Sequence, residues 1–163
     1  MKLFHFVPKT AILMALALTA CQQQPTGSEA EPDAKPGLSV SDAVLTLPAV
    51  KGNPGAAYFS VTNGSDQPTT LAAIHIDGAG KTEMHETKGG KMESVNWVQL
   101  NAGETVRFER GGKHVMVFDL TDKLASGGTA EMTLTFSGGD KLSTPLKIEA
   151  GGGGEAMDHG DKH

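Results

Sequence analysis

Hydrophobic and polar residues alternate in short runs from about residue 38 to residue 150, and turn-forming residues separate the runs. Alternation with a period of two is typical of strands that bury one face, and Asn-Gly or Gly-Gly pairs are typical of tight turns. Only residues 122–126 suggest a turn of helix. We therefore expect strands at 57–62, 71–76, 82–87, 91–95, 98–100, 105–110, 113–120, 131–136 and 141–148.

Pairs of adjacent glycines stand between several of these strands. Gly111-Gly112 and Gly138-Gly139 each predict a β-hairpin, and Gly89-Gly90 lies in a similar hairpin-like segment. Seven to nine strands with turns every ~8–12 residues are typical of an antiparallel β-sandwich. The predicted fold class is therefore all-β, with the sandwich domain at residues 37–150.

The first twenty residues have the pattern of a secretion signal. Lys2 and Lys9 supply a positive start, and residues 11–20 form an apolar run. Such a run is too short to span a bilayer, and no charged stop-transfer segment follows it. We expect residues 1–20 to direct export and to be removed.

The end of this run, Leu18-Thr19-Ala20-Cys21, resembles the processing box of bacterial lipoproteins. The resemblance implies cleavage before Cys21 and acylation of that residue, and several acyl chains together anchor a protein stably. Gln22 follows the cysteine, where Asp is the residue that suggests inner-membrane retention. The prediction is a periplasmic protein anchored by lipid, with the outer membrane favoured. The alternative is an ordinary signal peptide that ends near a cysteine.

Two polar segments flank the predicted domain. Residues 21–36 begin with Cys21 and contain too few large apolar groups to offset the entropy of ordering, so we expect a flexible tether. Residues 151–163 are predicted to be a disordered tail, and they carry Met157, His159 and His163 among acids. The tail is either a solubilising terminus or an auxiliary metal-binding arm, in which imidazole and carboxylate would favour Cu(II).

Charge and cysteine content restrict the functions open to this chain. There are 14 Lys and Arg against 19 Asp and Glu, which gives a net charge of −5. Nucleic-acid binding requires clustered positive charge, so we exclude a nucleic-acid partner. The single cysteine excludes an intramolecular disulfide.

A candidate metal site begins with His114 and Met116, two residues apart on a predicted strand. Alternation places both on one face, about 7 Å apart. His85 and Met92 lie upstream in the Gly89-Gly90 segment. Two imidazoles and two thioethers suit Cu(I), and thioethers escape the disulfide formation that threatens thiols in an oxidising compartment.

Each of these side chains also has a structural interpretation. Met116 shares its strand face with Phe118 and Leu120 and would otherwise be assigned to the core. The glycine pair before His114 suggests a sheet edge near solvent for that residue. The other candidates are expected to be structural: Met84 and Met132 as packing residues, and His75 as structural or exposed.

The wider pattern resembles the PCu(A)C family of periplasmic copper chaperones. Twenty-one residues separate Met92 from His114, and His114-Val115-Met116 completes that family's His-x-Met signature. The flanking residues Ala56-Ala57-Tyr58, Met84-His85-Glu86-Thr87 and Gly111-Gly112-Lys113-His114 also resemble the family. Only six residues separate His85 from Met92, where the family has about ten, and we expect a tighter hairpin to absorb the difference.

This resemblance implies a fold, a metal and a partner. The fold would be a cupredoxin-like Greek-key β-sandwich, and the site His85, Met92, His114 and Met116 would bind Cu(I). The recipient would be the binuclear copper centre of a cytochrome c oxidase subunit or another protein on that assembly path. We expect a monomer.

Three other functions remain to be weighed. A copper-buffering or resistance protein would need no dedicated recipient, and a β-sandwich interaction module would carry these His and Met residues incidentally. A blue-copper electron carrier needs a thiolate, and the predicted sandwich has no cysteine. No nucleophile–base arrangement emerges from the sequence, so we do not expect an enzyme.

Overall fold

The computed structural model describes residues 37–151 and forms strands throughout this range, without an α-helix. No helix among these residues is long and apolar enough to cross a membrane. The suggested helical turn at 122–126 is a pair of hydrogen-bonded turns, with Leu124 N–H donating to the Thr121 carbonyl at 3.1 Å. The strands are β1 (Leu38–Thr46), β2 (Gly55–Asn63), β3 (Thr69–Ile76), β4 (Ala79–Lys88), β5 (Lys91–Ser94), β6 (Val98–Leu100), β7 (Thr105–Phe108), β8 (Lys113–Leu120), β9 (Thr129–Phe136) and β10 (Lys141–Glu149).

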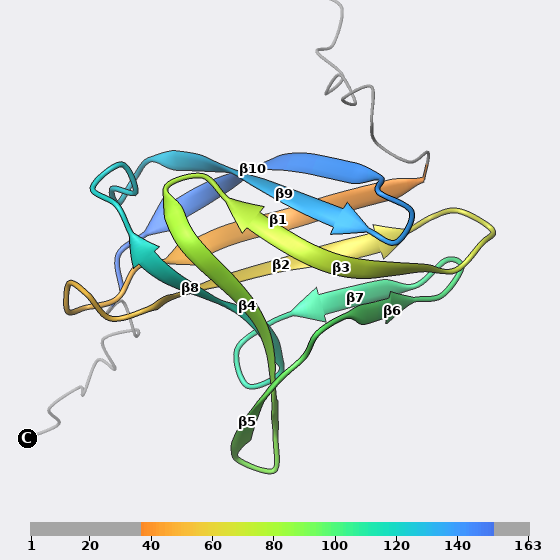
Figure 1. Ribbon diagram of the computed structural model, residues 1–163, viewed down its shortest axis with the longest axis horizontal. Coiled ribbons are helices and arrows are strands. Elements are labelled where there is room, and N and C mark those ends of the chain that lie inside the picture. The colour runs from red at the N-terminus through yellow and green to blue at the C-terminus, as the bar shows by residue number, and fades with distance from the viewer. Residues whose placement is uncertain (1–36, 152–163) are drawn as a thin grey trace, which may run out of the picture.

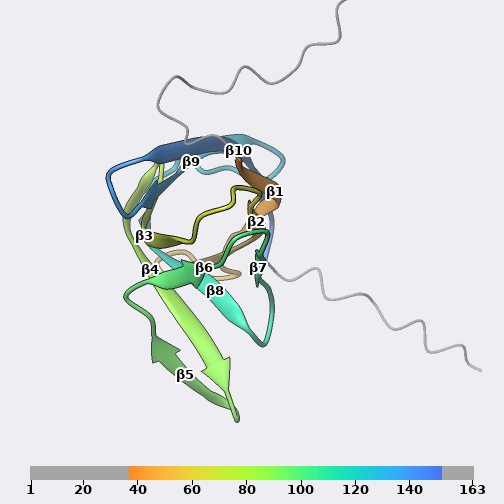
Figure 2. The ribbon, with the colours of Figure 1, turned by 90° about the vertical axis from the view of Figure 1, so that its right-hand side faces the viewer.

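These strands form one continuous sheet in the order β5-β4-β8-β7-β2-β1-β10-β9-β3-β6. The sheet curls around its core, so that β9, β10 and β1 face the layer that contains β8 (Figures 1 and 2). The hydroxyl of Thr82 in β4 donates to the Ile74 carbonyl of β3, which ties the two arms of the curled sheet together. Most pairings are antiparallel as expected, while β1 and β10 run parallel, as do β7 and β8 where Phe108 pairs with Lys113.

Period-two burial explains why this sequence forms the sandwich. Along β2 every second residue is buried, and β9 and β10 bury Met132, Leu134 and Leu146 fully. Phe59 of β2 stacks on Phe108 of β7, with ring centroids 4.4 Å apart. Burying these side chains removes apolar surface from water, which is the main stabilising term of the fold. The prediction that Met132 and Met84 are packing residues is confirmed, since both are buried.

The hairpin predicted at Gly111-Gly112 is wrong. β7 and β8 run in the same direction, and both pair with β2: Phe59 lies opposite Phe108, and Ala57 lies opposite Val115. The intervening residues loop out, closed by a hydrogen bond of 2.6 Å from Glu109 N–H to the Lys113 carbonyl. One edge of β2 pairs with β1, and the other edge is long enough to pair with β7 and then β8, so the chain continues along it instead of reversing.

The hairpins at the other two glycine pairs are confirmed. β9 and β10 pair across Gly138-Gly139. β4 and β5 pair across Gly89-Gly90, with Lys88 opposite Lys91 as the closing pair. Gly89 and Gly90 have φ angles of 57° and 77°, a left-handed combination that suits a two-residue hairpin turn. This hairpin extends away from the body of the sandwich (Figures 1 and 2).

Candidate metal centre

The register of β5, β4 and β8 puts all four predicted donors on one face of the sheet. His85 of β4 lies directly opposite His114 of β8, and Met116 lies opposite Glu83. Across the hairpin, Met92 lies opposite Thr87, which is two residues from His85 and therefore on the same face. The tight turn thus absorbs the shortened spacing and keeps Met92 with the other donors.

The imidazole of His114 is the centre of this face. Its Nδ1 lies 3.0 Å from the Gly112 carbonyl, and its Nε2 lies 3.3 Å from the Met92 sulfur. A carbonyl only accepts hydrogen bonds, so Nδ1 carries the proton and a neutral ring leaves the Nε2 lone pair free. The expectation that His114 sits at a sheet edge near solvent is wrong: it is 8% exposed, because β8 pairs with β4 on one side and β2 on the other.

The ring of His85 is held in a different way. Its Nε2 lies 3.0 Å from Glu83 Oε2, and its Nδ1 is buried without a hydrogen-bond partner among residues 37–151. The ring centroids of His85 and His114 are 6.0 Å apart. Metal–nitrogen bonds to imidazole are about 2 Å long, so rings at this separation are close enough to share one ion.

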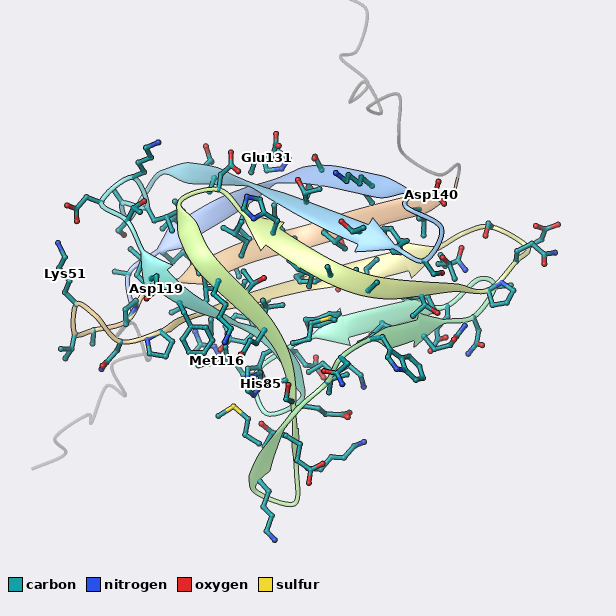
Figure 3. All side chains as sticks on the ribbon, viewed as in Figure 1. Lys51, His85, Met116, Asp119, Glu131 and Asp140 are labelled. Atoms are coloured by element: carbon teal, nitrogen blue, oxygen red, sulfur yellow. The ribbon has the colours of Figure 1, made fainter. Side chains whose placement is uncertain are left out.

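The two thioethers differ in exposure. Met92 is 55% exposed on the projecting hairpin, whereas Met116 is partly buried beside Ala56. Figure 3 shows His85 and Met116 near each other, on the paired strands β4 and β8. The donors therefore form an open face and not an enclosed cavity. A separate hollow of about 780 Å³, lined by Asp77, Glu131 and others, contains none of the four.

Paired charges surround the donors. Lys81 Nζ lies 2.5 Å from Glu83 Oε1, and this hydrogen bond, with that from His85, lowers the pKa of Glu83. On the other face of β4, Glu86 bridges Lys113 and Lys88 at 2.8 Å each, which lowers its pKa in the same way. Both carboxylates are acceptors that already have partners.

The chemistry of this donor set suits a soft ion. Among residues 37–151 there is no group of three or more His, Cys, Asp or Glu side chains that could hold a metal. Any site on this face must therefore use the thioethers, which Cu(I) accepts and hard ions do not. Within residues 37–151, the unpartnered Nδ1 of His85 and the lone pair on Nε2 of His114 are two nitrogen atoms available to such an ion.

The other predicted residues divide into two groups. His75 lies on β3, where it is exposed and pairs at 3.3 Å with Asp77 of the following turn, so it takes no part in the donor face. Cys21, Met157, His159 and His163 lie outside the described residues. The sequence analysis did not identify Glu83, which contacts His85. The available signal was that Glu83 lies two residues before His85 on a predicted strand, and therefore on the same face.

Comparison with known proteins gives a family match. The model of a family described as "Putative lipoprotein LpqE-like" matches residues 38–148. A putative lipoprotein of Leifsonia xyli subsp. xyli, Lxx21020, is 27% identical over 150 residues, which cover 87% of this chain and 89% of the relative. The uncharacterized protein RP573 of Rickettsia prowazekii is 26% identical over 72% of this chain and 64% of its own length.

Solved structures show the same fold. The copper-bound PCuAC domain from PmoF2 has a TM-score of 0.61 and 22% identity, covering 70% of this chain and 93% of that domain. The solution structure of CuI-DR1885 from Deinococcus radiodurans has a TM-score of 0.57 and 26% identity, covering 76% of this chain and 83% of that protein. The cupredoxin-like β-sandwich and the resemblance to PCuAC domains are thus confirmed.

Proposed function

This chain belongs to the LpqE-like family of lipoproteins, and from that premise we propose that it is an exported, lipid-anchored copper chaperone. It carries Cu(I) on the face formed by His85, Met92, His114 and Met116. Copper-bound proteins are among its structural neighbours, the PCuAC domain from PmoF2 and CuI-DR1885, and they support this metal. The periplasm is the proposed compartment, with Cys21 as the acylated residue and the outer membrane as the favoured location.

The observation that carries this proposal is the contact between His114 and Met92. Nε2 and the sulfur lie 3.3 Å apart, with the Nδ1 proton held by the Gly112 carbonyl. Two ligands of one tetrahedral ion lie roughly 3.5 Å apart when metal–donor bonds are about 2.0 and 2.3 Å long. The pair is therefore spaced for joint coordination before any ion arrives.

Ligand exchange is the proposed mechanism of delivery. Met92 lies on the solvent side of the site and His114 beneath it, at 55% and 8% exposure. A donor of the recipient can approach the ion from the side of Met92 and replace that thioether first. The imidazoles release the ion later, because they are more deeply placed.

Titration with Cu(I) against a competing chelator tests the site. The Met92→Ala, Met116→Ala double variant removes both thioethers, and we expect affinity to fall at least about 100-fold, more than the loss of a supporting residue causes. The control is Met84→Leu, which changes a buried methionine on the opposite face of β4 at nearly constant volume. Equal affinity of the double variant and the control would contradict the metal site.

A second candidate is a copper buffer without a dedicated recipient, favoured by the extra donors Met157, His159 and His163 in the tail. The two functions differ in directed transfer. The proposed recipient, from the family resemblance, is the binuclear copper centre of cytochrome c oxidase. Mixing the Cu(I)-loaded chain with an apo oxidase domain should move copper faster than dissociation into a chelator; equal rates would favour the buffer.

A further inference from the structure

We propose that Glu83 is a positioning residue of this copper site, which keeps the proton of His85 on Nε2 and so presents Nδ1 to the ion. The inference deepens the proposed function and rests on it. Glu83 is not one of the four donors. It lies two residues before His85 on the same face of β4, opposite Met116 of β8.

The hydrogen bond between the two side chains has a defined direction. Glu83 Oε2 lies 3.0 Å from His85 Nε2, and Glu83 Oε1 lies 2.5 Å from Lys81 Nζ. A carboxylate with an ammonium group on one oxygen is an acceptor only. Nε2 must therefore be the donor, and it carries the single proton of a neutral imidazole.

The opposite nitrogen of the same ring then becomes the metal-binding atom. Nδ1 of His85 is buried and has no hydrogen-bond partner in the part of the chain that the structure describes. Buried polar atoms in folded proteins nearly always have a partner, so each exception calls for a reason. A lone pair that is available to a cation supplies that reason. The hydrogen bond to Glu83 keeps the ring proton on Nε2, and Nδ1 therefore stays unprotonated.

His114 provides an internal comparison, because its tautomer is fixed in the opposite sense. Its Nδ1 donates to the Gly112 carbonyl, and its Nε2 points to the Met92 sulfur. One imidazole is thus oriented by the backbone and the other by a side chain. Hydrogen bonds of this kind to the second nitrogen fix the orientation and basicity of metal-binding histidines. Only the Glu83 contact can be removed by substitution.

The tautomer of His85 in the copper-free mature chain, residues 21–163, is the direct test. Long-range ¹H–¹⁵N correlation spectra distinguish a protonated from an unprotonated ring nitrogen. We expect Nε2–H in the unchanged chain, and in Glu83→Ala a mixture of tautomers. Glu83→Gln should retain much of the Nε2–H form, because the amide oxygen still accepts. Glu83 is partly exposed, so both variants should fold, as a backbone amide spectrum would verify.

Cu(I) affinity is the second readout. We expect Glu83→Ala to bind Cu(I) about tenfold more weakly, the lower range for loss of a supporting hydrogen bond. The matched control is Glu86→Ala, which removes the same charge from the same strand but on the opposite face, and it should bind within about twofold of the unchanged chain.

The possible failures can be told apart. If Glu83→Ala keeps a pure Nε2–H tautomer, or binds Cu(I) as tightly as Glu86→Ala, the positioning role is wrong and the proposed function is untouched. If the unchanged chain does not bind Cu(I), the proposed function is wrong, and with it the role assigned to Glu83, whatever the tautomer.

Discussion

Residues on the donor face differ in how firmly the fold holds them. His114 is buried, hydrogen-bonded to the backbone and flanked by strands on both sides, whereas Met92 is exposed at the end of a projecting hairpin. A thioether with three rotatable bonds is adaptable, while a ring fixed at one nitrogen is preorganised. We infer a division of labour in which His114 retains the ion and Met92 controls its exchange.

Single substitutions of the donors should therefore differ in how much Cu(I) affinity they remove. We expect His114→Ala to reduce Cu(I) affinity more than Met92→Ala does, because it removes the preorganised donor as well as one bond to the ion. His75→Ala is the control, since His75 is exposed and pairs with Asp77 away from the donor face. The Cu(I) affinity of this variant should equal that of the unchanged chain. Competition with a Cu(I) chelator measures all three; an equal loss for His114→Ala and Met92→Ala would contradict the ranking.

The local pattern of apolar and polar residues predicted the positions of the strands well, but it predicted less well which strands pair. The predicted 113–120 and 98–100 coincide with β8 and β6, because period-two alternation and glycine pairs are local signals. The hairpin between β7 and β8 was wrongly predicted because Gly111-Gly112 indicates a turn but does not determine the pairing partner of the next strand. Both β7 and β8 pair with β2 and not with each other as a hairpin. Burial of His114 was missed for the same reason, since it depends on neighbours remote in sequence.

The turn of the β4–β5 hairpin should control copper binding through geometry alone. Gly90 has a φ of 77°, which costs a β-branched residue about 1–2 kcal/mol. This strain opens the hairpin and moves Met92 of β5 away from the other donors. Gly90→Val should therefore lower Cu(I) affinity roughly 5–30-fold, the factor that corresponds to about 1–2 kcal/mol. Gly89→Asn is the control, since asparagine tolerates this conformation.

Thermal unfolding without copper separates this effect from general damage. The hairpin projects from the sandwich, and β5 exposes all four of its residues, so it contributes little to the core. The melting temperature of Gly90→Val should therefore stay close to that of Gly89→Asn while its copper affinity falls. A parallel loss of both would mean that the turn supports the whole fold.

At the scale of the whole molecule, the curled sheet separates stability from binding. β8 turns Val115 and Val117 into the core, where both are fully buried, and turns His114 and Met116 to the outer face. The donor spacing was predictable from sequence because this alternation is strict over the strand. The role proposed for Glu83 was not predictable, since a Glu two residues from a His becomes informative only when the structure places both side chains.

The described domain contains every donor of the proposed site, which predicts the copper stoichiometry of the whole chain. Removing residues 152–163 should leave one Cu(I) per chain at unchanged affinity, because His85, Met92, His114 and Met116 all lie within residues 37–151. Copper analysis after gel filtration, with the mature chain as reference, measures this number. Loss of a second equivalent on truncation would instead assign metal binding to Met157, His159 and His163, and would favour the buffer over the chaperone.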